Sequence, residues 1–316
     1  MTKKRFGLIG TAGYIAPRHL KAIQETGNVL VASTDINDSV GILDSYFPKS
    51  EFFTEFEEFQ SFIQDENLKG NPLDFISICS PNHLHSTHIK LALNAGCDVI
   101  CEKPLVLSIA ELEEIKRYEK ETNKRVFSIL QLRLHPSIKS LKALIEKQGN
   151  AKVFEVDLTY ITSRGLWYEK SWKGIENKSG GVASNIGVHF FDMLSFVFGN
   201  PRNTSVQYKD AQSIIGTSIF EFARVRWCLS INSSLLPNNA VQGEKLTYRS
   251  IKIEGKELEF SDGFTELHNE SYRNILAGQG FGIEENRAAL ETVQFIRECD
   301  VCHSIADPHP LLKKLK

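Results

Sequence analysis

A lysine and a histidine stand out in the sequence as groups able to hold or move a proton. Lys103 follows a short apolar run, Val99 to Cys101, and is followed at once by Pro104. The run is apolar on both faces and too short for a helix, which predicts a buried strand that ends at the proline. Because ligands of parallel α/β sheets lie beyond the carboxyl ends of the strands, we expect Lys103 at a ligand site rather than on an ordinary solvated surface.

His189 is the second candidate. It lies in an apolar helical run that follows the glycine pair 180–181 and continues through Phe198 to Gly199. Asp192 comes one turn later, at the i, i+3 spacing at which helical side chains meet. The sequence leaves two interpretations open, a core histidine satisfied by its neighbours and a site residue. The glycine pair, typical of close approach of the backbone to a ligand or strand, supports the second.

A glycine turn near the start resembles a dinucleotide-binding fingerprint. An expected buried strand over residues 5–9 runs into Gly10, Gly13 and Ala16, and a helix follows with Pro17 in its first turn. The middle glycine is displaced from the usual Gly-x-Gly-x-x-Gly/Ala spacing. A helix start offers free N–H groups and the positive end of the helix dipole, which suit a pyrophosphate.

Asp35 marks the end of a second expected strand, residues 29–32. It follows Gly13 by about 20 positions, the spacing of the acid that holds an adenosine ribose. A carboxylate there repels a 2′-phosphate, and residues 36–38 contain no arginine to hold one. These features predict NAD rather than NADP. An aspartate that only caps a turn is the alternative.

Composition sets the class of protein. The chain has 316 residues, 41% of them hydrophobic and 24% charged, with a net charge of −2. This length and composition are typical of a globular protein of about two domains. The net charge excludes a strongly basic surface of the kind that binds nucleic acid or an anionic membrane. The N-terminal apolar run is too short for a signal peptide, and no stretch approaches the ~20 apolar residues that span a bilayer. We therefore expect a cytoplasmic protein, in which disulfides are uncommon.

Two groups of metal-ligand residues lack a complete ligand set. The histidines at 83, 85 and 88 have no accompanying carboxylate or fourth ligand. Cys299 and Cys302 supply half of a zinc set, and with His303 they match a haem-attachment spacing that the expected cytoplasmic location argues against. We predict no metal.

The pattern of elements divides the chain in two. Strands and helices alternate through residue 130, including a capping box at Ser108 and Glu111 that opens a helix to Thr122, and this predicts a doubly wound parallel sheet. Period-two alternation, which indicates strands of a largely antiparallel sheet, begins at 153 and recurs over 203–208, 213–222, 224–231, 247–254 and 257–261. The predicted fold is α/β. It has an NAD-binding Rossmann domain over 1–130 and a substrate-binding and oligomerisation α/β domain with a large, mainly antiparallel open sheet over 131–316.

Together these motifs resemble the glucose–fructose oxidoreductase, inositol dehydrogenase and MocA (Gfo/Idh/MocA) family over essentially the whole chain. The resemblance rests on the glycine turn, Asp35, the histidine helix and the runs 80–82, 102–104 and 272–278. Within the family, residues 13–19, 100–107 and 171–174 are similar to the branch of UDP-N-acetyl-glucosaminuronate 3-dehydrogenases of bacterial surface-polysaccharide synthesis.

The branch implies NAD-dependent oxidation of the sugar's 3′-hydroxyl to a ketone, towards a diacetamido uronic acid of lipopolysaccharide O-antigen. If the reduced cofactor stays bound, an oxidised acceptor such as 2-oxoglutarate is expected to recycle it. The family also implies a homo-oligomer, a dimer or tetramer. Another sugar or polyol dehydrogenase of the family stays an alternative, as does a non-enzymatic NAD-binding regulator, against which the presence of both Lys103 and His189 argues.

Lys103 and His189 are the expected catalytic pair. His189 is the expected proton acceptor, because an imidazole titrates near neutral pH unaided, and Lys103 is expected to hold the hydroxyl or its oxyanion. The reverse order requires a neutral lysine, which desolvation and the positive nicotinamide ring favour. Many family members have an aspartate where this chain has Asn185, which cannot take a proton.

The binding residues form two sets. The expected cofactor-binding residues are Gly10, Ala12, Gly13, Tyr14, Ile15, Asp35, Ser80, Pro81, Asn82, His85, Glu102, Lys103 and Gln131. A nucleotide sugar also needs cations for its diphosphate and carboxylate, and arginine suits bidentate contacts. The expected substrate-binding residues are Lys103, Arg133, Arg164, Tyr168, Trp172, Lys173, Asn185 and His189.

Overall fold

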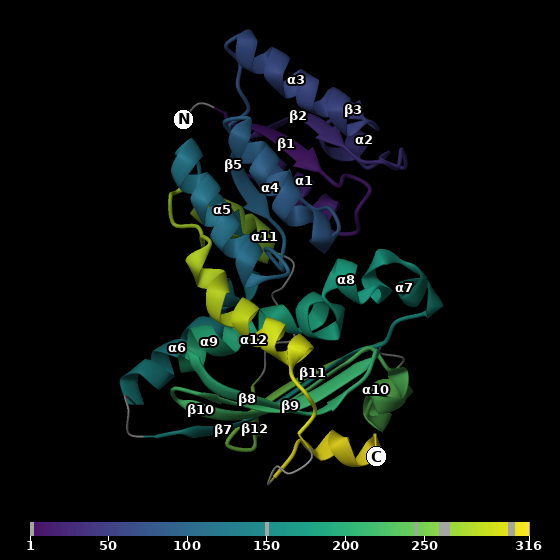
Figure 1. Ribbon diagram of the computed structural model, residues 1–316, viewed down its shortest axis with the longest axis vertical. Helices are drawn as coiled ribbons and strands as arrows, with labels where there is room; N and C mark the ends of the chain where they lie inside the picture. Colours follow the sequence, from purple (N-terminus) through teal and green to yellow (C-terminus); the bar gives the residue numbers. More distant parts are fainter. Residues whose placement is uncertain (1–2, 149–151, 244–245, 259–265, 303–306, 316) are drawn as a thin grey trace. The chain divides into compact units, whose positions relative to one another are not determined.

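The structure, a computed structural model, describes residues 3–148, 152–243, 246–258, 266–302 and 307–315, which form two compact units (Figure 1). The first unit is Met1–Gln131 with Thr265–Arg287, and the second is Leu132–Phe264 with Ala288–Lys316. The sequence predicts a single division after residue 130. The structure instead returns a late segment to the first unit, because helix α11 (Leu267–Leu276) buries its apolar face in that unit's core.

The first unit contains a six-stranded parallel sheet in the order β3-β2-β1-β4-β5-β6, which confirms the predicted doubly wound architecture. Its strands are β1 (Arg5–Ile9), β2 (Val29–Thr34), β3 (Glu51–Phe53), β4 (Phe75–Ile78), β5 (Asp98–Cys101) and β6 (Val126–Ser128). All six run in one direction, so their carboxyl ends lie at one edge of the sheet, where the predicted cofactor residues follow them.

Helices cover both faces of this sheet. Phe6 and Leu8 of β1 pack in one cluster with the apolar faces of α1 and α11. Gly7 lies between them. A Cβ at this position would point to the other face of the sheet, where it would lie 3.3 Å from the Phe59 ring of α3 (Phe56–Leu68). Besides α11, the helices of this unit are α1 (Ala16–Glu25), α2 (Leu43–Tyr46), α3 (Phe56–Leu68), α4 (His85–Asn94) and α5 (Ile109–Thr122).

The second unit contains a mixed sheet in the order β12-β11-β7-β10-β9-β8. Only β7 and β10 pair in parallel, so the predicted mainly antiparallel sheet is confirmed. The strands are β7 (Phe154–Thr162), β8 (Pro201–Lys209), β9 (Ser213–Phe220), β10 (Ala223–Ser230), β11 (Thr247–Ile253) and β12 (Lys256–Glu257). Of the strand predicted at 257–261, residues 259–261 lie outside the described residues.

Helix α9 (Val188–Phe198) forms the core of the second unit. Phe191 meets the ring of Trp227 edge-on, and Phe198 contacts Phe154. Within the described residues, the helical run Glu176–Phe198 is the one segment long and apolar enough to cross a membrane, and 72% of its apolar window is buried inside the protein. This run is therefore a core helix. The unit's other helices are α6 (Pro136–Gln148), α7 (Leu166–Lys170), α8 (Glu176–Ser179), α10 (Asn238–Gln242) and α12 (Arg287–Glu298).

The predicted capping box is present at the start of α5. The Ser108 hydroxyl accepts a hydrogen bond from the Glu111 N–H, and the Glu111 carboxylate accepts one from the Ser108 N–H. We predict that Ser108→Ala lowers the free energy of unfolding by about 1 kcal/mol, because a helix N–H loses its partner. Urea unfolding followed by circular dichroism measures this. The control is Ser61→Ala, whose hydroxyl bonds only its own helix backbone. Equal stability of the two variants would contradict the cap's contribution.

Candidate functional site

Four adjacent strands of the first unit end in the predicted cofactor residues. Residues 10–15 follow β1, Asp35 follows β2, residues 80–82 follow β4, and residues 102–103 follow β5. These strands are neighbours in the order β2-β1-β4-β5, so the structure brings their ends together along one edge. Gln131 follows β6, the neighbour of β5 in the sheet, at the end of the first segment of this unit.

The glycine turn after β1 has no room for side chains. Gly10 adopts a φ of 91°, and a Cβ there would lie 2.7 Å from the backbone of Cys79. A Cβ on Gly13 would lie 2.9 Å from the Gly10 carbonyl oxygen. Among the described residues, none accepts a hydrogen bond from the backbone N–H of Tyr14 or Ile15. The turn thus offers donors to a close-lying anion, so it fits a dinucleotide's pyrophosphate despite the displaced glycine.

Asp35 is fixed beside this turn. Its Oδ2 accepts a hydrogen bond of 2.9 Å from the Ala12 N–H, and its Oδ1 accepts one of 2.9 Å from the Asn37 N–H. The half-buried carboxylate therefore joins the glycine turn to the end of β2. Its negative charge stands at the edge of the sheet, as the predicted selection against a 2′-phosphate requires.

His85 joins the turns that follow β4 and β5. Its Nδ1 lies 2.8 Å from the Pro104 carbonyl oxygen, and its Nε2 lies 2.8 Å from the Ser80 carbonyl oxygen. Burial lowers the pKa of His85, although both carbonyls favour its protonated form. The Ser80 hydroxyl is in turn 2.8 Å from Nδ1 of His88. These predicted cofactor side chains are thus engaged within the protein and hold the turns in place.

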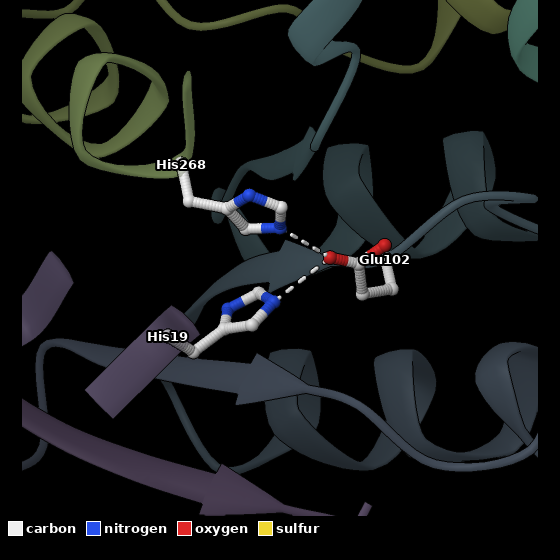
Figure 2. Close-up of side chains that lie close together, drawn as sticks. All are labelled: His19, Glu102 and His268. Carbon is white, nitrogen blue, oxygen red and sulfur yellow. Dashed lines mark hydrogen bonds and ion pairs between the residues drawn. The ribbon is translucent and has the colours of Figure 1, made fainter. Parts of the chain in front are cut away.

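Glu102 is the central residue of a buried cluster (Figure 2). Its Oε1 accepts hydrogen bonds from Nε2 of His19, at 3.0 Å, and from Nε2 of His268, at 2.9 Å. Its Oε2 accepts the Lys103 N–H at 3.3 Å and lies 4.0 Å from the Lys103 ammonium. Burial alone raises the pKa of Glu102, but the two histidine hydrogen bonds and the lysine charge hold it well below its ordinary value.

The cluster continues into the core. The Tyr272 hydroxyl lies 2.7 Å from Nδ1 of His19 and 2.6 Å from the Ser77 hydroxyl. The ligand atoms of His19, Glu102 and His268 lie within 4.8 Å of one another, as a metal site requires. The nitrogen–oxygen separations are those of N–H···O hydrogen bonds, however, and both donors face one acceptor. The cluster is therefore a hydrogen-bonded one.

The sequence did not assign His19 or His268 to any site. His19 falls between apolar positions of α1, Ala16 and Leu20, and is fully buried. A histidine on the buried face of a helix needs a polar partner, which was the available signal. No signal identified that partner, because Glu102 and His268 are far from His19 in the sequence.

In the second unit, His189 and Asn185 lie on consecutive turns. Asn185 belongs to a π-helical stretch, Ala183–Gly187, that leads into α9. Its Nδ2 donates a hydrogen bond of 2.6 Å to the Tyr168 hydroxyl, and the Arg164 guanidinium stands 6.0 Å from the Tyr168 ring. Single-turn π-helices are frequent at functional sites. Three predicted substrate residues, Arg164, Tyr168 and Asn185, are therefore brought together.

Tyr160 is a further neighbour of His189 that the sequence did not reveal, and Arg249 is in turn a neighbour of Tyr160. The Tyr160 ring lies 6.5 Å from the His189 ring, edge to face. Arg249 is directly opposite Tyr160 in the β7–β11 register, and its guanidinium stands 5.4 Å from the Tyr160 ring. The strand register therefore places this arginine beside Tyr160.

Arg133 occupies a different environment from the one expected. Its guanidinium binds the Asp192 carboxylate through Nε, at 3.0 and 3.1 Å, and Nη2, at 2.6 Å, and its side chain is only 10% exposed. Its charge is therefore paired within the protein with that of Asp192, the acid one helical turn after His189. Gly180 and Gly181 both adopt positive φ, at 77° and 66°, and both line the cavity described next, so the close approach of a ligand stays a prediction.

A cavity of about 850 Å³ opens in the second unit beside α7 and α8. Tyr168 and Lys173 line it, together with Glu176 and Arg297. The Lys173 ammonium also stands 4.8 Å from the Trp172 ring. The volume is that of a small-molecule site, and its lining supplies an aromatic surface and cations.

A glycine turn and a strand-end acid at the carboxyl edge of a parallel sheet define the class of dinucleotide-binding Rossmann proteins. Residues 4–130 match the model of the oxidoreductase family Gfo/Idh/MocA with an NAD-binding Rossmann fold, and residues 142–218 match the model of its C-terminal alpha/beta domain. The chain belongs to the Gfo/Idh/MocA family.

Two solved structures are similar over nearly the full length. The WlbA (WbpB) dehydrogenase of Thermus thermophilus, in complex with NAD and alpha-ketoglutarate, is 47% identical, with 98% of this chain and 99% of that chain covered and a TM-score of 0.94. The same enzyme with NAD and UDP-GlcNAcA is 46% identical over 98% and 99% of the two chains, with a TM-score of 0.93.

Curated relatives are similar to a smaller part of this chain. The D-glucoside 3-dehydrogenase of Escherichia coli is 30% identical over 145 residues, which are 45% of this chain and 40% of that protein. The chain thus spans less than half the length of the first curated relatives it matches.

We predict that Asp35→Ala weakens NAD binding about tenfold and narrows the preference for NAD over NADP, because a ribose acceptor and a charge that repels the 2′-phosphate are both lost. Fluorescence titration with each reduced cofactor measures this. Asp38→Ala, an exposed acid of the same loop, is the control. An unchanged NAD to NADP affinity ratio in the Asp35 variant would contradict the assignment.

Proposed function

We propose that this chain oxidises the 3′-hydroxyl of UDP-N-acetyl-glucosaminuronic acid to the 3-keto sugar with NAD, as a cytoplasmic step in making a diacetamido uronic acid for O-antigen. The observation that carries the proposal is the 46% identity, over nearly all of both chains, with a WlbA dehydrogenase whose structure holds NAD and UDP-GlcNAcA. The family relationship alone supports only a sugar or polyol dehydrogenase.

The first unit supplies the cofactor residues. The free N–H groups of the glycine turn suit the pyrophosphate, and the carboxylate of Asp35 suits the adenosine ribose. Bound NAD accepts a hydride from the carbon that carries the reacting hydroxyl. Ser80, His85 and Glu102 act indirectly in this proposal, because their side chains hold the turns that carry Asn82 and Lys103.

Lys103 and His189 supply the proton chemistry. The Lys103 ammonium donates a hydrogen bond to the 3′-oxygen and stabilises negative charge as the hydroxyl loses its proton. His189 accepts that proton, because a neutral imidazole is a base near neutral pH. Asn185, whose amide is bound to Tyr168, orients the sugar and takes no proton.

The substrate's anionic groups need cations in the second unit. Arg164 is exposed beside Tyr168, and Lys173 lines the 850 Å³ cavity with Tyr168. We assign these groups, with Trp172, to the nucleotide sugar. Arg133 is left out of the direct contacts because its guanidinium already pairs with Asp192.

Alpha-ketoglutarate in the Thermus thermophilus structure supports a second half-reaction in which 2-oxoglutarate reoxidises bound NADH. The protein is proposed to work as a homo-oligomer, a dimer or tetramer.

The proposal is tested with a panel of substrates. The protein is incubated with NAD and UDP-N-acetyl-glucosaminuronic acid, UDP-N-acetylglucosamine, UDP-glucuronic acid or myo-inositol, and both free and protein-bound reduced nicotinamide are measured by absorbance. We expect reduction with the first compound alone, and repeated turnovers when 2-oxoglutarate is added. Reduction with inositol in place of the nucleotide sugar would support the broader dehydrogenase alternative. Absence of reduction with every compound would support the non-enzymatic one.

We predict that Lys103→Ala and His189→Ala retain NAD affinity within about threefold but lose at least about 100-fold in kcat, because each removes a group that handles the reacting proton. Stopped-flow absorbance and NAD titration measure the two quantities. Lys90→Ala, which removes a lysine paired with Glu114, is the control. A variant with a near-normal rate would remove that residue from the mechanism.

A further inference from the structure

We propose that Glu102 is a positioning residue for Lys103, and that His19 and His268 clamp its carboxylate so that one oxygen is left for the lysine. The inference rests on the proposed role of Lys103. It adds residues that position the lysine. These residues lie on α1, on α11 and in the turn after β5, all within the first unit.

The two carboxylate oxygens of Glu102 have separate partners. Oε1 accepts both histidine hydrogen bonds, at 3.0 Å from His19 on α1 and at 2.9 Å from His268 on α11 (Figure 2). Within the described part of the chain, Oε2 faces only Lys103, through the lysine's backbone N–H at 3.3 Å and its ammonium at 4.0 Å. Two donors on one oxygen prevent the carboxylate from rotating. The other oxygen is thereby fixed toward the lysine.

The hydrogen-bond pattern fixes which histidine nitrogen donates. An ionised carboxylate can only accept, so Nε2 of His19 carries the proton given to Glu102, and in the neutral ring Nδ1 is left to accept from the Tyr272 hydroxyl. Burial lowers the pKa of His268, which keeps that ring neutral and donating through Nε2. The His268 ring therefore holds the carboxylate without neutralising its charge.

Lys103 is the cation left to balance this carboxylate. The other titratable groups that interact with Glu102 are Cys79 directly after β4, Cys101 on β5, His85 on α4 and Tyr272 on α11. Burial raises the pKa of both thiols and of Tyr272 well above the ordinary values, so these groups are uncharged. A buried carboxylate is unfavourable unless it is paired. The negative charge of the Glu102 carboxylate therefore holds the Lys103 ammonium in place.

The clamp is tested without relying on turnover. Acetic anhydride modifies neutral amines, and mass spectrometry of the digested holoenzyme gives the pH midpoint at which each lysine becomes reactive. For Glu102→Gln we expect Lys103 to become reactive at a lower pH than in the parent protein, because the carboxylate charge 4.0 Å away is removed. Lys90, paired with Glu114 and similarly exposed, is the internal control. An unchanged Lys103 midpoint would overturn the proposal.

Kinetics separate positioning from a merely structural role. His268→Phe removes one of the two donors, and we expect kcat to fall about tenfold with NAD affinity nearly unchanged, together with a lower melting temperature because a buried carboxylate loses a donor. His268→Gln restores an N–H donor, and we expect it to recover most of the loss. Equal rates in the two variants, or a loss confined to NAD affinity, would contradict the clamp. If the wild-type protein turns over no substrate, the proposed function fails while the acylation result still decides the role of Glu102.

Discussion

The structure of the first unit depends on one buried interaction, the ionised carboxylate of Glu102 between two histidines. Glu102 is the first residue after β5, His19 lies on α1, and His268 lies on α11. A buried carboxylate without donors is strongly unfavourable, so these elements must meet for any of them to be stable there. This requirement explains why the segment Thr265–Arg287 returns to the Rossmann unit, and it places Lys103 at the edge where the cofactor residues follow their strands.

The fold followed from the sequence because its signals are local. Short apolar strands separated by amphipathic helices predicted the parallel sheet, and strict alternation after residue 153 predicted the second sheet. The positions of Gly10, Asp35 and Lys103 also followed, since parallel strands bring successive strand ends to one edge. A capping box such as that of Ser108 needs only four residues to be recognised.

The partners of the site residues could not be predicted, because they depend on contacts between distant parts of the chain. Arg133 carries the charge expected of a substrate ligand, but packing places it against Asp192. Arg249 lies beside Tyr160 through the β7–β11 register. His19 and His268 are separated by most of the chain and share one acceptor. Residue type and spacing thus predict where chemistry occurs, whereas the partners of each side chain are set by tertiary packing.

The ionisation of Glu102 is the most direct test of this account. Carbon-13 NMR of protein labelled at glutamate carboxyls, compared with the Glu102→Gln variant to assign the resonance, follows that one group as the pH is lowered. The account predicts that Glu102 stays ionised below its ordinary pKa of 4.5 for as long as the protein is folded. The stability it contributes is then present above that pH and is lost as the pH falls through the lower value of the folded state. A carboxyl that titrates at or above 4.5, or is already protonated at neutral pH, would contradict the account.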